Sequence, residues 1–124
     1  MCQVNQAEIM QLRIQEVLAV IHEEYTQDIS LDYLAQKVYL SPCYLSMLFS
    51  KYIGVSLLSY INTYRMEKAV DLLLETDTKV KDICQLVGYR NLPYFCTCFK
   101  NRFQMTPAQY RQFYTDFTPL SSAV

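Results

Sequence analysis

The sequence predicts an all-α fold, and three observations support this prediction. Only 2 glycines and 4 prolines occur among 124 residues, too few for the many turns of a strand-rich fold. Apolar residues make up 52% of the chain, enough for one compact domain or two very small ones. They recur every three or four residues along most of the sequence, the period of helices with one buried face. We therefore expect seven helices and no strand.

The first three helices follow from this period and from capping residues. Residues 9–25 place their apolar side chains on one helical stripe. Ser30 is a typical N-cap before a helix over residues 31–38. Ser41, followed by a proline suited to the first helical position, begins a third helix that Gly54 ends.

The fourth helix is expected to be the longest. Ser56 caps a run over residues 57–76 that contains no glycine or proline. Its apolar positions keep to one helical face, so the run predicts a single helix of about five turns. Lys68 is expected to face solvent on this helix.

Three shorter helices complete the chain. Each has its own start signal, and the short polar tail is expected to fray. Thr78 precedes a helix over residues 79–87 that Gly88 ends, Leu92-Pro93 begins the next, and Thr106-Pro107 caps the last.

The helices fall into two copies of one pattern. When the sequence is shifted by 49–50 residues, apolar positions of the first half coincide with apolar positions of the second. Each copy is a short helix, a tight turn, a longer helix and a capped following helix, and two copies are too few for a solenoid. We therefore predict two subdomains and a linker within residues 1–124: 8–55 as the first subdomain, 56–76 as the linker helix, 77–117 as the second subdomain and 118–124 as the frayed tail.

Each copy has the arrangement of a helix-turn-helix. A small residue stands where the two helices cross, Ala35 in the first copy and Cys84 in the second, because the helix axes approach closely there. The longer helix then has an inner face, with Phe95, Cys98 and Phe99 in the second copy, and an outer face that can enter a major groove. An αα-hairpin that binds no ligand is the alternative for any single copy.

The charge distribution favours an anionic partner for the second copy. Net charge is −1, which alone speaks against a nucleic-acid-binding protein. Residues 1–36, however, include one basic and six acidic residues, whereas residues 79–111 include six basic residues and one acidic residue, Asp82. Such an asymmetry indicates a negatively charged partner near the second copy.

The sequence favours neither an enzyme nor a metal site, and no cofactor is expected. The 5 cysteines are an odd number, and Cys43 and Cys84 are interpreted as small buried residues of a reducing cytoplasm. Cys96 and Cys98 are two residues apart in a helix and point to different faces, and the single histidine, His22, lies on an acidic helix. No catalytic constellation and no glycine-rich phosphate loop occurs in the sequence.

Four motifs follow one another in the second half of the chain: Arg65-Met66-Glu67-Lys68-Ala69, Val87-Gly88-Tyr89, Tyr94-Phe95 and Thr106-Pro107-x-x-Tyr110-Arg111. Through these motifs the sequence from Ile14 to Tyr114 resembles the DNA-binding domain of AraC/XylS-type bacterial transcription regulators. The segment Leu40-Ser41-Pro42-x-Tyr44-Leu45 is similar to the C-terminal domains of YesN-like response regulators. The resemblance implies two recognition helices in successive major-groove segments of an operator. It also implies RNA polymerase as a partner and a regulatory domain N-terminal to this one in the full-length protein.

The candidate DNA-binding residues lie on the outer faces of the two recognition helices. They are Ser41, Cys43, Tyr44, Ser46, Met47, Ser50 and Lys51 in the first copy, and Arg90, Asn91, Leu92, Pro93, Tyr94, Thr97, Lys100 and Asn101 in the second. Arg90 and Asn91 are the best candidates for base or phosphate contact, because both precede a recognition helix. Arg102 and Arg111 either contact the nucleic acid as well or serve as solvated ends or intramolecular pairs.

Two positions depart from the family pattern, because Met47 and Thr97 stand where a basic residue is common. Methionine makes only apolar contacts, for example with a thymine methyl group, or it is simply an exposed apolar residue. Gln104 likewise replaces the glycine found at position 54 in the first copy. The alternative function is therefore a degenerate helix-turn-helix that binds a protein through the apolar surface of Met47, Tyr44 and Cys43 and through the acidic first helix. We expect a cytoplasmic protein, since no stretch of the sequence approaches the length of a membrane span.

Overall fold

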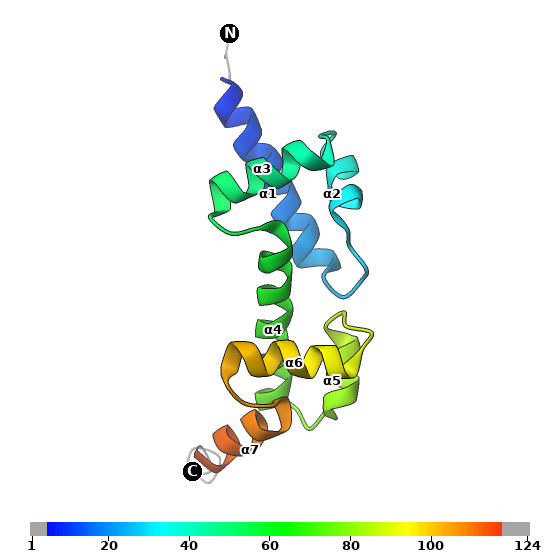
Figure 1. Ribbon diagram of the computed structural model, residues 1–124, viewed down its shortest axis with the longest axis vertical. Coiled ribbons are helices and arrows are strands. Elements are labelled where there is room, and N and C mark those ends of the chain that lie inside the picture. Colours follow the sequence, from blue (N-terminus) through cyan, green and yellow to red (C-terminus); the bar gives the residue numbers. More distant parts are fainter. Residues whose placement is uncertain (1–4, 118–124) are drawn as a thin grey trace. The chain divides into compact units, whose positions relative to one another are not determined.

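The computed structural model describes residues 5–117 and is helical throughout (Figure 1). The prediction of seven helices without a strand is confirmed over these residues. The tail predicted to fray, residues 118–124, lies outside them. The helices are α1 (Gln6–Glu24), α2 (Leu31–Lys37), α3 (Pro42–Ile53), α4 (Leu57–Glu75), α5 (Val80–Leu86), α6 (Leu92–Phe103) and α7 (Pro107–Phe117).

Most helix starts follow the predicted side-chain caps. The Oγ atoms of Ser30, Ser41 and Ser56 accept the backbone N–H three residues further on, at 3.1, 3.2 and 3.1 Å. Thr106 and Gln109 form a reciprocal pair at the start of α7: each side-chain oxygen accepts the other residue's backbone N–H, at 3.2 and 2.9 Å. Each cap satisfies an amide that the first helical turn leaves without a partner.

Two expectations about α4 and α5 are wrong. Thr78 does not cap α5, because the N-cap position of this helix lies one residue later in the sequence. Lys79 occupies the N-cap position instead and makes no side-chain cap. Lys68 is half-buried on α4 rather than solvent-facing, because its side of the helix lies next to the buried stripe that includes Ala69.

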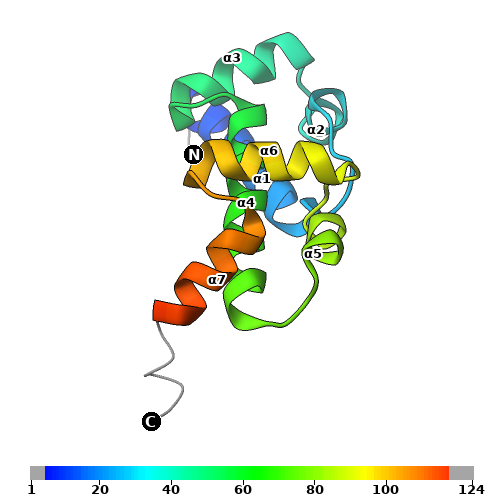
Figure 2. The ribbon, with the colours of Figure 1, turned by 60° about the horizontal axis from the view of Figure 1, so that its bottom comes forward.

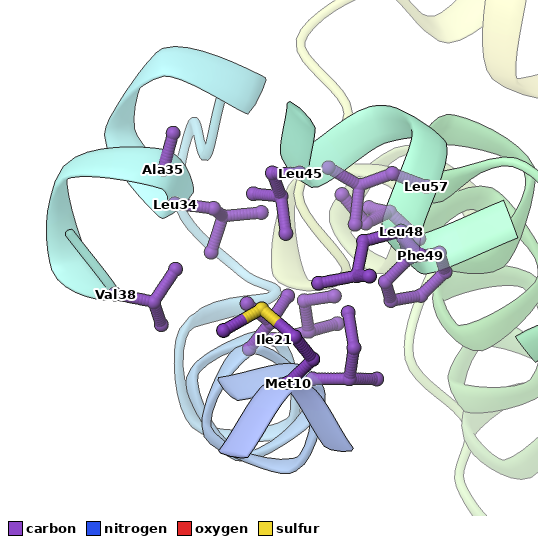
Figure 3. Packing of buried hydrophobic residues seen from close by; sticks show 12 residues of the cluster. Met10, Ile21, Leu34, Ala35, Val38, Leu45, Leu48, Phe49 and Leu57 are labelled. Atoms are coloured by element: carbon purple, nitrogen blue, oxygen red, sulfur yellow. The ribbon is translucent and has the colours of Figure 1, made fainter. Parts of the chain in front are cut away.

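The residues divide into two compact units, and the division falls within α4 between Tyr64 and Arg65. The first unit has a core in which α1, α2 and α3 pack against one another. Figure 3 shows side chains from these helices pointing into one shared space, among them Ile21, Leu34 and Phe49, all three fully buried. Removing apolar surface from water stabilises this packing by about 25 cal/mol per Å².

The second unit packs α6 against both α5 and α7. Phe95 and Phe99 are fully buried, and the Phe99 ring lies 4.5 Å from that of Phe103 and 5.4 Å from that of Tyr110, centroid to centroid. Figure 2 shows α6 lying across the end of α5, with a short turn between them. The predicted short turns between α2 and α3 and between α5 and α6 are confirmed.

Left-handed backbone conformations occur at equivalent places in both units. Gly54 (φ 91°) ends α3, and Gln104 (φ 66°) ends α6. The left-handed conformation is less favourable for glutamine than for glycine, as expected from the sequence. In the turns within the two helix pairs, Gly88 has φ 99° and Tyr39 has φ 60°. The positive φ expected of Gly88 is confirmed.

Candidate nucleic-acid interface

The outer face of α3 is defined by what its inner face buries. Leu45, Leu48 and Phe49 are buried, and Ser41 with the following proline fixes the direction of the first turn. Every candidate residue of the first copy is exposed: Ser41, Cys43, Tyr44, Ser46, Met47, Ser50 and Lys51. Lys51 is the one cation among them, and its Nζ lies 5.5 Å from the centre of the Tyr52 ring, a cation–π distance.

The outer face of α6 is built in the same way. Asn91 caps the helix, with its Oδ1 accepting the backbone N–H of Tyr94 at 2.9 Å, and Phe95 and Phe99 are buried on the inner side. The candidates of the second copy are again all exposed: Arg90, Asn91, Leu92, Pro93, Tyr94, Thr97, Lys100 and Asn101. The cap uses only the oxygen of the Asn91 amide, so its nitrogen remains a donor for a ligand.

Two candidates on α6 are tied to neighbouring groups. The Thr97 hydroxyl donates to the Pro93 carbonyl at 3.0 Å, so its proton is already engaged within the helix. A hydrogen bond with Cys98 raises the pKa of the exposed Tyr94 phenol above its ordinary value. Both hydroxyls keep lone pairs, but phosphate oxygens require donors. Donors for a nucleic acid are therefore concentrated at Arg90, Asn91 and Lys100.

Arg111 has an intramolecular role. Its Nε donates to the Leu73 carbonyl at 3.0 Å, and its Nη2 donates to the Thr76 carbonyl at 3.1 Å. The end of α4 leaves backbone carbonyls without partners within the helix, and a guanidinium can donate hydrogen bonds to them. Its positive charge is also favourable at the negative end of the helix dipole. Of the two alternatives weighed for this arginine, the intramolecular one is confirmed. Arg102 is exposed and lines a hollow of about 430 Å³ with Glu67 and Asp71 of α4.

The cysteines differ from the sequence interpretation at two positions. Cys84 is buried as expected, and burial raises the pKa of its thiol. Cys43 is exposed, so the prediction that it is buried is wrong; it occupies the outer face of α3, two positions before Leu45. Cys98, expected on the inner face of α6, is only half-buried.

The single histidine belongs to an aromatic cluster of the first unit. His22 Nε2 lies 2.8 Å from the Tyr60 hydroxyl, and its ring stacks on Tyr64 at 4.6 Å between centroids. Within residues 5–117, no three histidine, cysteine, aspartate or glutamate side chains come together as metal ligands.

Tyr39 is an unusual exposed residue that the sequence reasoning missed. It lies in the turn before α3, is 86% exposed and has φ 60°, a conformation that bulky residues rarely adopt. The internal repeat places it opposite Gly88. That alignment could have identified it as a tyrosine in a glycine position.

Comparison with known proteins shows the family. The helix-turn-helix domain family model HTH_18 matches residues 34–112. YtdP of Bacillus subtilis, named as an uncharacterized HTH-type transcriptional regulator, is 38% identical over 96 residues, covering 77% of this chain and 12% of that protein. The chain thus spans a small part of the length of that relative.

Two solved structures extend the comparison to three dimensions. The C-terminal domain of the two-component response regulator YesN from Fusobacterium nucleatum has a TM-score of 0.76 and 41% identity, covering 78% of this chain and 95% of that one. The DNA-binding domain of AdpA, solved in complex with a target DNA, has a TM-score of 0.83 and 25% identity, covering 86% and 96%. The chain belongs to the AraC/XylS-type helix-turn-helix family of transcription regulators.

No single helix within residues 5–117 is long and apolar enough to cross a membrane. By length and composition alone, α3 and α4 reach that threshold only as a pair bent by 60°.

Proposed function

We propose that this domain binds operator DNA with both recognition helices, α3 and α6, in successive segments of the major groove. The observation that carries this proposal is that all fifteen candidate contact residues are exposed, on helix faces opposite buried ones. Paired helices of this kind read sites about 34 Å apart on one side of the duplex. The similarity to the AdpA domain, solved with its target DNA, supports DNA as the partner.

The proposal includes a larger protein around the domain. A regulatory domain N-terminal to residue 1 would control it, in keeping with the similarity to a response-regulator C-terminal domain, and RNA polymerase would be the second partner. Such a regulator would act in the bacterial cytoplasm, where the operator lies. The regulator would bind DNA without catalysing a reaction. Contacts with phosphates and base edges require hydrogen-bond donors and a complementary shape, and no reacting group.

A footprint tests the two-helix mode. A duplex enriched by the chain from a random pool is cleaved with hydroxyl radicals in the presence and absence of protein. Two protected segments one helical turn apart on the same face are expected. A single protected segment would contradict the mode, since only one helix would then be in a groove.

A protein-interaction module is the second candidate, and the surface of α3 favours it. That face presents Tyr44, Met47 and Cys43 to solvent with Lys51 as its one cation, a composition closer to a protein contact than to a phosphate contact. Residues 79–111 include six basic residues and one acidic residue, which argues against the protein-interaction module. Enrichment of no duplex sequence by the chain would favour this second candidate.

A further inference from the structure

We infer that α3 recognises DNA through the 5-methyl groups of pyrimidines, with Met47 as the reading side chain. This inference rests on the proposed function and names the chemistry that the first recognition helix selects. It assigns a preference for thymine that follows from the methyl group itself rather than from hydrogen-bonding edges.

The outer face of α3 lacks the side chains that read base edges by paired hydrogen bonds. Arginine, lysine, asparagine and glutamine make such contacts with guanine and adenine. None of them stands among the exposed residues of α3 before Lys51, which include Cys43, Tyr44, Ser46, Met47 and Ser50. Lys51 lies in the last turn of α3, over the Tyr52 ring. Serine hydroxyls can bond to any base and discriminate little.

Apolar contact is the readout that remains, and Met47 is placed to make it. Its side chain is 60% exposed in the middle of α3, opposite the buried Leu45, Leu48 and Phe49. The exposed Cys43 lies one turn earlier on the same side of the helix. A long, flexible thioether adapts to an irregular apolar surface, and the thymine methyl is the apolar group that the major groove offers.

The second recognition helix provides the contrast. The exposed Arg90, Asn91, Lys100 and Asn101 carry the fork and amide donors that α3 lacks, so α6 can discriminate by hydrogen bonds. Sensitivity to the loss of a thymine methyl group is therefore expected at the bases that α3 faces.

Replacing thymine with deoxyuracil tests the inference, because this change removes the methyl group and leaves every hydrogen-bonding edge intact. A duplex enriched by the chain from a random pool is remade with one uracil at a time, and affinity is measured by fluorescence anisotropy. Burial of one methyl-sized group contributes a factor of about four in affinity. About fourfold weaker binding is expected at one or two thymines.

Two variants assign the effect. Met47→Ala should bind the thymine and uracil duplexes equally, whereas Leu86→Ala, which truncates another exposed leucine-sized side chain on α5 (52% exposed), should retain the difference. Both sites are on the surface, so circular dichroism should show unchanged helix content.

The possible failures are distinguishable. Equal affinity for every uracil duplex would overturn the inference while leaving DNA binding intact. A uracil effect that persists in Met47→Ala would overturn the assignment to Met47. Enrichment of no duplex at all would remove the proposed function, and the inference with it.

Discussion

The two helix-turn-helix units agree inside and differ outside. Ala35 and Cys84, the small residues predicted at the helix crossings, are both buried, and so are Phe49 and Phe99, which the internal repeat aligns. The outer faces differ in charge, since α3 presents one exposed cation, Lys51, whereas α6 and the turn before it present three, Arg90, Lys100 and Arg102. The fold is therefore maintained by a small set of inner residues, and the reading surface can diverge without disturbing it.

A second difference concerns where each unit uses glycine. Unit one has a glycine at the end of its longer helix, Gly54, and a tyrosine in its turn, Tyr39. Unit two reverses the choice, with Gln104 at the helix end and Gly88 in the turn. The architecture demands a left-handed residue at both places, and each sequence supplies glycine at only one of them.

Core truncation is expected to have the largest effect and tests whether the units are separate. Phe49→Ala and Phe99→Ala each remove a fully buried ring, which costs about 3–5 kcal/mol of unfolding free energy. Hydrogen exchange should show lost protection in the unit that carries the substitution and retained protection in the other. Loss throughout residues 5–117 in both variants would mean that the units unfold as one.

Charge removal sharpens the comparison of the outer faces. Arg90→Ala should weaken operator binding more than Lys51→Ala, because Arg90 precedes the recognition helix of the basic copy and Lys51 lies at the far end of α3. Loss of a paired base contact costs about 1–3 kcal/mol and relaxes specificity at one base pair. Anisotropy with the selected duplex and its single-base variants measures both. A larger loss for Lys51→Ala would reverse the assignment of the two faces.

The helix shared by both units can be tested by softening it. Glu67 is exposed on α4, close to the division between the units. Glu67→Gly costs about 1 kcal/mol of helix stability and should weaken binding to a two-half-site duplex more than to a single half-site, because flexibility lowers the effective concentration of the second reader.

Glu67→Ala is the matched control, since it removes the same carboxylate and keeps the helix. If the glycine and alanine variants bind both duplexes alike, α4 does not act as a rigid spacer. The two units would then read DNA independently, or one alone would touch it.

Exchange of the left-handed residues should give the smallest effect. Gly54→Ala is expected to destabilise the protein by about 1 kcal/mol, because φ is 91° although no atom lies within 4 Å of the added Cβ. Gln104→Gly places a glycine in the left-handed conformation that a glutamine now adopts, so it should stabilise the protein by less than about 1 kcal/mol. Urea denaturation midpoints measure both changes. A shift of the same sign for both variants would contradict the reversed use of glycine.

Much of the fold was predictable because its signals are local. Ser30, Ser41, Ser56 and Thr106 cap helices through contacts three residues away, which a sequence displays directly. Thr78 failed as a predictor because α5 begins one residue later than expected, with Lys79 at the N-cap position and no side-chain cap.

The remaining errors depend on tertiary structure. Arg111 reaches carbonyls of Leu73 and Thr76, far away in the sequence. The half-burial of Lys68 depends on which side of α4 packs against other helices, whereas the exposure of Cys43 follows from the helical period that also made it a contact candidate. The candidate contact residues were placed on exposed faces from helical periodicity alone, but their contacts with DNA stay a prediction.

The salt dependence of duplex binding tests the central claim most directly. With about 5–7 phosphate contacts, the logarithm of the binding constant should fall with the logarithm of salt concentration with a slope of about −4 to −6. The net charge is −1, and Met47 and Thr97 stand where basic residues are common in the family. The isolated domain should therefore bind DNA with a dissociation constant of about micromolar. A slope near zero on every duplex, the selected one included, would contradict DNA binding and favour the protein-interaction module.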